Sequence, residues 1–137
     1  MPTYLTNSEK ETKNLAKKMA KKKRGVIALI GELGAGKTTF VQGFAKSLGI
    51  KEKIISPTFV LIRQHKIPSG ATLYHVDLYR LEEGKNIAEL GLSELWSNPQ
   101  NLVLIEWAEK AEIYLPKKIT RVELKKTGRN EREIIVS

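Results

Sequence analysis

The stretch VIALIGELGAGKT, residues 26–38, constrains the fold of this chain more than any other part of its sequence. Five aliphatic residues, Val26–Ile30, are typical of a strand buried on both faces of a parallel sheet. A glycine-rich loop follows, and KTTFVQGFAKSLG (37–49) then predicts a helix that ends at Gly49. A buried strand that runs through such a loop into a helix predicts an α/β fold.

The loop itself fits the phosphate-binding pattern G-x-x-x-x-G-K-[ST] at Gly31, Gly36, Lys37 and Thr38. Its glycines allow φ values at which backbone N–H groups turn inward toward a phosphate. Lys37 would reach the β- and γ-phosphate oxygens, and the Thr38 hydroxyl would bind Mg²⁺. The candidate nucleotide-binding residues of this segment are Gly31, Glu32, Leu33, Gly34, Ala35, Gly36, Lys37, Thr38 and Thr39.

Hydrolysis of a bound nucleotide requires carboxylates as well, and two stand out. Glu106 follows the aliphatic run LVLI, where a second buried strand would end. Asp77 lies in YHVDLYR and is expected in the middle of an apolar strand, where a charge is costly without a metal or water. We expect Glu106 to bind Mg²⁺ and Asp77 to bind the attacking or Mg²⁺-bound water, and these roles could be exchanged. The alternatives are an acid at an exposed strand end for Glu106 and an ion pair with Arg80 for Asp77.

Two further residues are candidates on weaker patterns. Thr58, in SPT (56–58), occupies the chain position at which nucleotide switches carry a γ-phosphate-sensing threonine, or else it belongs to an ordinary Ser-Pro turn. Trp107 follows the candidate acid and is either a core residue or a partner contact. No Asn-Lys-x-Asp run, which reads guanine, is present, so ATP is favoured over GTP.

The rest of the chain predicts one domain over residues 1–137. Ser8 and Glu11 form a capping box for a helix that should end at Gly25. Residues 58–67 and 71–81 flank a PSG turn and predict an antiparallel hairpin, residues 86–96 and 108–115 favour short helices, and residues 119–136 predict a terminal hairpin. We therefore expect a P-loop NTPase-type mixed β-sheet, with a parallel core and antiparallel hairpins, flanked by helices.

Composition excludes several other functions. The chain has no cysteine and only two histidines, which argues against disulfides, thiolate catalysis and Cys- or His-based metal clusters. No apolar run approaches the ~20 residues that span a bilayer, and no leader pattern opens the sequence, so we expect a cytoplasmic protein without membrane contact. The net charge of +9 is concentrated in KKMAKKKRG (17–25). These lysines are either a solvated helix end or a patch for RNA or an acidic partner.

The P-loop, SPTF, HVDLYR, GLSE and LIEW occur here in the order in which the TsaE (YjeE) family carries them, and the chain resembles that family over nearly its full length. The resemblance implies a bacterial P-loop ATPase needed for the threonylcarbamoyladenosine modification at position 37 of tRNA, working with the TsaD–TsaB pair. It implies that residues 32–37 bind ATP, that Thr38 and Glu106 hold Mg²⁺ and that Asp77 is a catalytic acid. It also places Thr58 in a switch-like loop, Trp107 at a functionally sensitive position, and Glu109 and Arg129 beside the nucleotide.

Together these features predict a Mg²⁺-dependent ATPase that is slow alone and faster with its partner, because no arginine is placed plainly to stabilise the transition state in cis. A small-molecule kinase and a nucleotide-gated tRNA-binding adaptor are the alternatives. Contact with tRNA would be indirect or through the basic patch.

Overall fold

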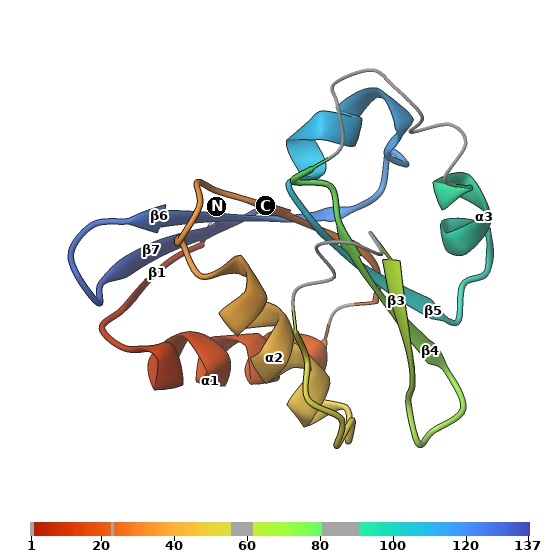
Figure 1. Ribbon diagram of the computed structural model, residues 1–137, viewed down its shortest axis with the longest axis horizontal. Helices are drawn as coiled ribbons and strands as arrows, with labels where there is room; N and C mark the ends of the chain where they lie inside the picture. Colours follow the sequence, from red (N-terminus) through yellow and green to blue (C-terminus); the bar gives the residue numbers. More distant parts are fainter. Residues whose placement is uncertain (1, 23, 56–61, 81–90) are drawn as a thin grey trace.

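The computed structural model describes residues 2–22, 24–55, 62–80 and 91–137, and these form a seven-stranded sheet with helices on both faces (Figure 1). The strands are β1 (Thr3–Thr6), β2 (Gly25–Ile30), β3 (Ile62–Lys66), β4 (Thr72–Asp77), β5 (Asn101–Glu106), β6 (Thr120–Lys126) and β7 (Arg132–Val136). The helices are α1 (Glu9–Ala20), α2 (Lys37–Ser47), α3 (Leu92–Ser97) and the 3₁₀ helix η2 (Ala108–Tyr114). None of these helices is long and apolar enough to cross a bilayer.

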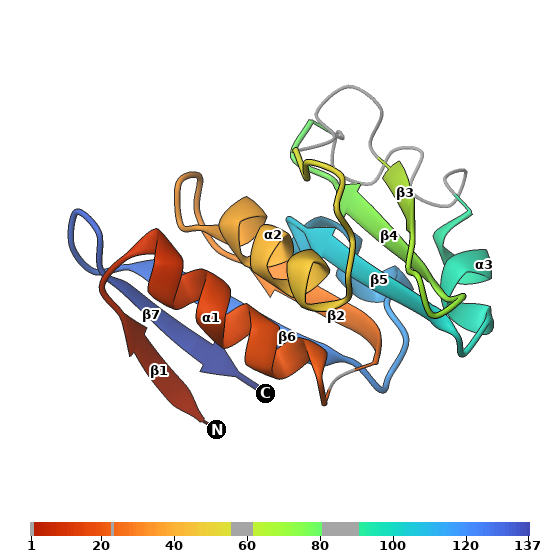
Figure 2. The same cartoon turned by 90° about the horizontal axis from the view of Figure 1, so that it is seen from below.

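The sheet has the order β1-β7-β6-β2-β5-β4-β3. The central strands β6, β2, β5 and β4 are parallel, whereas β3 pairs with β4, and β7 with both β6 and β1, in antiparallel fashion. This arrangement confirms the predicted mixed sheet, with its parallel core and its two antiparallel hairpins. In Figure 2 the two hairpins lie at opposite ends of the sheet.

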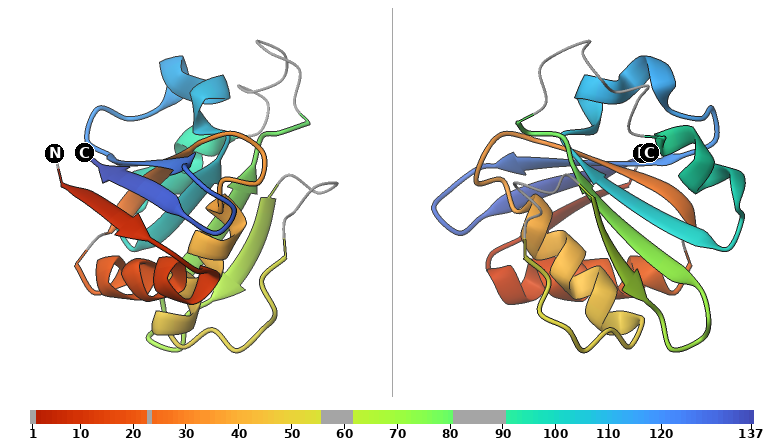
Figure 3. Two further views of the ribbon diagram at one scale, coloured as in Figure 1. Left: turned by 90° about the vertical axis from the view of Figure 1, so that its left-hand side faces the viewer. Right: turned by 45° about the vertical axis from the view of Figure 1, so that its right-hand side comes forward.

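Two hydrophobic clusters cover the two faces of the sheet, which is why the central strands are apolar throughout. Ile27 and Leu29 of β2 point into the cluster beneath α1 and α2, while Val26 and Ala28 point into the cluster beneath α3 and η2. The strand β5 alternates in the same way. Figure 3 shows the two helical layers on opposite sides of the sheet.

The first helix starts as its sequence predicts and ends earlier. The Ser8 hydroxyl accepts a hydrogen bond from the Glu11 N–H at 3.1 Å, and the Glu11 carboxylate accepts one from the Asn7 N–H at 3.1 Å. The helix ends at Ala20, so the predicted end at Gly25 is wrong. Gly25 instead begins β2 with a φ of 80°, which favours glycine.

Two other segments refine the sequence-based prediction. The strand β1 was not predicted; its burial pattern is exposed at three of its four residues, so it lacks the alternation that marks a half-buried strand. The helical prediction for residues 86–96 is confirmed at α3, while residues 86–90 lie outside the described part.

Candidate functional site

The glycine-rich loop connects the carboxyl end of β2 to the start of α2, as the sequence predicts. Gly34 and Gly36 have φ values of 82° and 103°, which side chains rarely adopt. Gly31 is required for a different reason, because a Cβ there would lie 2.5 Å from the carbonyl oxygen of Leu124 in the neighbouring strand β6. The amides at the start of α2 receive no side-chain cap from Gly36, which suits them to bind an anion.

Lys37 is buried against the loop that precedes it. Its ammonium group donates hydrogen bonds to the carbonyl oxygens of Gly31 and Glu32, the latter at 2.9 Å, and lies 4.1 Å from the ring centroid of Trp107. Burial lowers the pKa of Lys37, and the nearby carboxylates, first Glu106 and then Glu109, oppose that shift. The cation is thus held where negative charge, from a carboxylate or a phosphate, is needed to stabilise it.

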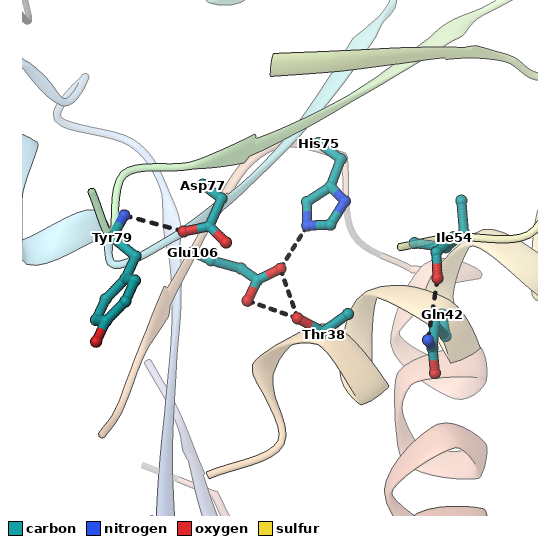
Figure 4. Close-up of polar contacts among 7 residues, drawn as sticks. All are labelled: Thr38, Gln42, Ile54, His75, Asp77, Tyr79 and Glu106. Atoms are coloured by element: carbon teal, nitrogen blue, oxygen red, sulfur yellow. Dashed lines mark hydrogen bonds and ion pairs between the residues drawn. The ribbon is translucent and has the colours of Figure 1, made fainter. Parts of the chain in front are cut away.

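Thr38 and Glu106 meet although 68 residues separate them (Figure 4). The Thr38 hydroxyl lies 2.9 and 3.0 Å from the two carboxylate oxygens of Glu106. His75 Nε2 is hydrogen-bonded to Oε2 of the same carboxylate. The Glu106 carboxylate is therefore fixed by one residue of α2 and one residue of β4.

Asp77 lies beside Glu106 because the parallel strands β4 and β5 end together, with Asp77 and Glu106 in register. Both carboxylates are buried, with exposed fractions of 4% and 3%. The expectation that Asp77 sits in mid-strand is wrong. It is the last residue of β4, where the chain turns and the Tyr79 N–H donates to Asp77 Oδ1 at 2.9 Å.

These groups surround a cavity of about 440 Å³, within the usual size range of ligand pockets. It is lined by Ser8, Glu9, Thr12, Leu33, Gly34, Gly36, Lys37, Thr38, Thr39, Asp77, Tyr79, Glu106, Trp107, Asn130 and Arg132. The structure thus brings both candidate carboxylates to the glycine-rich loop. Three other loop residues, Gly31, Glu32 and Ala35, form the loop without lining the cavity.

Two predicted residues are placed differently. Glu109 is exposed, and it acts on Lys37 through its charge without lining the cavity. Arg129 lies in the turn between β6 and β7, and its neighbours Asn130, in the same turn, and Arg132, the first residue of β7, line the cavity instead. Thr58 lies outside the described residues.

Of the residues that line the cavity, sequence reasoning missed Ser8, Glu9, Thr12, Tyr79, Asn130 and Arg132, and it also missed His75 and the conformation of Trp107. His75 precedes Asp77 by two residues on the same strand, so the period of a strand places both on one face, and this signal was available. Arg132 donates from Nε to the Ala35 carbonyl at 3.1 Å and from Nη2 to the Gly34 carbonyl at 3.0 Å. No local pattern points to that contact. Trp107 adopts a φ of 59°, and the centroid of its ring lies 5.1 Å from the centroid of the Tyr79 ring.

The oxygen atoms gathered here suit a magnesium ion. Among the described residues, no three His, Cys, Asp or Glu side chains form a metal-binding group of their own. Mg²⁺ is usually held by one or two carboxylates together with substrate phosphates and water, and needs no complete protein cage. The Thr38 hydroxyl and the two buried carboxylates fit that role beside the glycine-rich loop.

Comparisons with known proteins agree with this geometry. Residues 6–134 match the family model described as "Threonylcarbamoyl adenosine biosynthesis protein TsaE". The chain is 42% identical over 133 residues to the tRNA threonylcarbamoyladenosine biosynthesis protein TsaE of Bacillus subtilis, covering 96% of this chain and 82% of that protein. It is 46% identical over 124 residues to the protein of the same name from Rickettsia bellii, covering 88% and 84%.

A solved structure extends the likeness to three dimensions. The crystal structure of YdiB from Bacillus subtilis superposes with a TM-score of 0.79 at 36% identity, covering 97% of this chain and 82% of that one. With a family model that matches nearly the whole chain and relatives this similar, the chain belongs to the TsaE family, whose members take part in the biosynthesis of threonylcarbamoyladenosine in tRNA.

Proposed function

We propose that this chain is a Mg²⁺-dependent ATPase that supports threonylcarbamoyladenosine formation in tRNA together with the TsaD–TsaB pair. The observation that carries the proposal is the contact between the Thr38 hydroxyl and the Glu106 carboxylate beside the glycine-rich loop. It joins a phosphate-binding loop to an acid from a neighbouring strand at one cavity.

The residues of the cavity divide the work of binding and hydrolysis. The loop amides and the start of α2 bind the phosphate chain, and Lys37 neutralises its outer oxygens. Thr38 and Glu106 would hold the Mg²⁺, which neutralises phosphate charge when it is bound. Asp77, on the adjacent strand end, orients the attacking water. Because phosphoryl transfer proceeds through a loose transition state, positioning and charge neutralisation account for most of the catalysis.

Substitutions at the two kinds of group test this division. Lys37→Ala should weaken ATP binding, because the loop loses its cation. Glu106→Gln and Asp77→Asn should retain most ATP binding, measured by titration calorimetry, and lose hydrolysis, measured as phosphate release. Retained hydrolysis in both acid variants would exclude the proposed roles of the two carboxylates.

The arrangement of arginines supports low activity of the isolated chain. Arg132 lines the cavity, but its guanidinium group is bound to carbonyl oxygens of the loop itself. An arginine supplied in trans typically raises the rate by ~10³–10⁵. We therefore expect the TsaD–TsaB pair to accelerate phosphate release by orders of magnitude. An acceleration of less than about threefold would argue against activation by the partner, because it falls far below that range.

A further inference from the structure

A second hollow lies on the face of the molecule that carries α1 and α2. It has a volume of about 950 Å³ and runs between α1, α2 and the segment that follows α2. Glu9 lines both this hollow and the cavity beside the glycine-rich loop, which we call the nucleotide cavity after its proposed function. Figure 2 shows the two helices side by side with that segment next to α2. We call this hollow the basic groove; its lining residues are Glu9, Lys10, Lys13, Asn14, Lys17, Gln42, Lys46, Gly49, Ile50, Lys51, Glu52, Lys53 and Ile54.

The groove is strongly positive. Its lining has six lysines against two glutamates, a net charge of +4 in a chain whose total is +9. Lys10, Lys13 and Lys17 follow helical spacing along one side of α1, while the other lysines come from α2 and the segment after it. Within the described part of the chain, none of the six forms an ion pair with a carboxylate. Their charge is therefore available to a ligand.

The walls of the groove are tied together. The Gln42 side chain donates to the Ile54 carbonyl at 3.0 Å, which fixes the segment after α2 against that helix (Figure 4). The Ser47 hydroxyl donates to the Lys17 carbonyl at 3.2 Å, which fixes the end of α2 against α1. The lysines therefore project from a preformed frame, and a ligand need not order the backbone when it binds.

The chemistry of the lining favours a nucleic acid backbone over a protein. Protein interfaces are poor in lysine and centre on aromatic or arginine anchors. The groove is rich in lysine, and no aromatic residue or arginine is among its lining residues. Single-stranded nucleic acid is usually held by aromatic side chains that stack on its bases, and these are also missing from the lining. Lysines without aromatic stacking groups suit the phosphates of a double helix.

The spacing of the lysines agrees with such a ligand. Seven residues of helix from Lys10 to Lys17 rise about 10 Å. One strand of a double helix carries a phosphate every ~3.4 Å of axis, so this row alone spans about three phosphates.

We propose that the basic groove binds the phosphodiester backbone of an RNA double helix. We choose RNA over DNA because the family takes part in tRNA modification. The evidence for the groove, its lysines and its fixed walls, does not depend on the proposed ATPase chemistry. Because Glu9 lines both hollows, the RNA would lie next to the nucleotide cavity.

A pair of charge-matched variants tests the groove. The groove variant changes Lys10, Lys17, Lys51 and Lys53 to Gln, and the control variant changes Lys66, Lys117, Lys118 and Lys126 to Gln. All four control lysines are exposed and line neither hollow. The probe is an RNA duplex of about 16 base pairs, the span that a double-stranded-RNA-binding domain covers. Its affinity is measured by fluorescence anisotropy between about 50 and 200 mM salt.

We expect the groove variant to bind the duplex at least ~10-fold more weakly at low salt, with a salt slope smaller by about one for each lysine removed. The control variant should stay within ~3-fold of the unmodified chain, since its lysines lie away from the groove. Equal losses in the two variants would overturn the proposal, because net charge alone would then explain binding. Tighter, groove-dependent binding of poly-glutamate than of the duplex would also overturn it and would assign the groove to an acidic protein.

Two controls separate this proposal from the ATPase. The groove variant should keep its thermal unfolding midpoint and its rate of phosphate release, because none of its four residues lines the nucleotide cavity. Lys37→Ala should bind the duplex as the unmodified chain does. If Lys37→Ala loses hydrolysis and still binds RNA, the result tests only the proposed ATPase function. If the groove variant loses RNA binding and still hydrolyses ATP, the result tests only the proposal for the groove.

Discussion

The buried carboxylate of Glu106 depends on His75 for one of its hydrogen bonds. The His75 ring is fully buried, and its Nδ1 has no hydrogen-bond partner among the described residues. Nε2 is the ring atom that faces the carboxylate, so a proton there is the donor that the ring offers to Glu106. His75 therefore orients the carboxylate through this one contact.

This role of His75 can be tested by replacing the ring with and without a donor. His75→Leu removes the donor and leaves a buried carboxylate partly unsatisfied, so we expect a loss of ~1–3 kcal/mol in the free energy of unfolding. His75→Gln can offer an amide N–H toward the same carboxylate and should lose less. Urea denaturation measures both. Equal losses in the two variants would show that the ring only fills space.

For single residues, the sequence predicts those members of the candidate site that belong to a short, continuous sequence pattern. The loop pattern identifies Lys37 and Thr38, and the acid after an aliphatic run identifies Glu106. The mid-strand position expected for Asp77 was wrong because a strand's end depends on hydrogen bonds that the sequence does not display, here the turn at Tyr79. The contact of Arg132 with the glycine-rich loop could not be predicted from the sequence, because Arg132 and Ala35 are 97 residues apart.

Among the elements, α1 and α2 pack closely at a single glycine. A Cβ on Gly43 would lie 2.5 Å from the carbonyl oxygen of Lys13 and 2.6 Å from its Cα, both backbone atoms that cannot rotate away. Glycine at this position lets the two helices approach and so fixes their separation. The same separation sets the width between two walls of the basic groove.

We therefore expect Gly43→Ala to destabilise the fold although alanine is the better helix former. The clash should cost ~1–3 kcal/mol, and the gain in helix propensity returns only ~1 kcal/mol. The measurement is the midpoint of urea unfolding. Lys46→Ala, at an exposed position of the same helix, is the matched control and should change stability by less than ~0.5 kcal/mol. Higher stability of Gly43→Ala than of the unmodified chain would contradict this packing.

The 3₁₀ helix η2 is joined to β6 by a paired contact between the Glu112 carboxylate and the Arg121 guanidinium, in which Nη1 lies 2.9 Å from Oε2. The hydrogen bond from Arg121 lowers the pKa of Glu112. The pair therefore stabilises the folded state above the ordinary pKa of glutamate, and this contribution is lost as the pH falls through the lowered value. Both side chains are more than a third exposed, so solvent keeps the contribution below ~1 kcal/mol.

Glu112→Gln should accordingly be slightly less stable than the unmodified chain at neutral pH. The difference should shrink in acid, since protonation of Glu112 removes the same charge that the substitution removes. Urea unfolding of both proteins at neutral pH and at a pH below the lowered pKa measures it. A difference that stays constant across this range would show that the ion pair does not contribute.

Element prediction succeeds where a segment's own pattern decides its structure. Ser8 and Glu11 mark the start of α1 because the cap is a local interaction. The strand β1 depends on pairing with β7, at the other end of the chain, and such pairing leaves little trace in four residues.

In the whole molecule, the cavity beside the glycine-rich loop lies where the parallel strands β2, β4 and β5 end, which is the usual place of ligand sites in open α/β sheets. The antiparallel side of the sheet also reaches this cavity through the first residue of β7. Arg132 donates to two carbonyl oxygens of the loop and to the carbonyl of Glu131 at 2.8 Å. It thereby connects the terminal hairpin to the loop that would hold the phosphates.

This connection predicts that the terminal hairpin contributes to nucleotide affinity without touching the phosphates. Arg132→Met keeps much of the side chain's length and removes both hydrogen bonds to the loop, so the loop must be ordered by the nucleotide itself. We expect ATP affinity, measured by titration calorimetry, to fall about tenfold, equivalent to ~1.4 kcal/mol. Arg129→Met is the matched control, since Arg129 is exposed in the same turn and does not line the cavity. A larger loss in Arg129→Met than in Arg132→Met would favour the role beside the nucleotide that the family resemblance implies for Arg129.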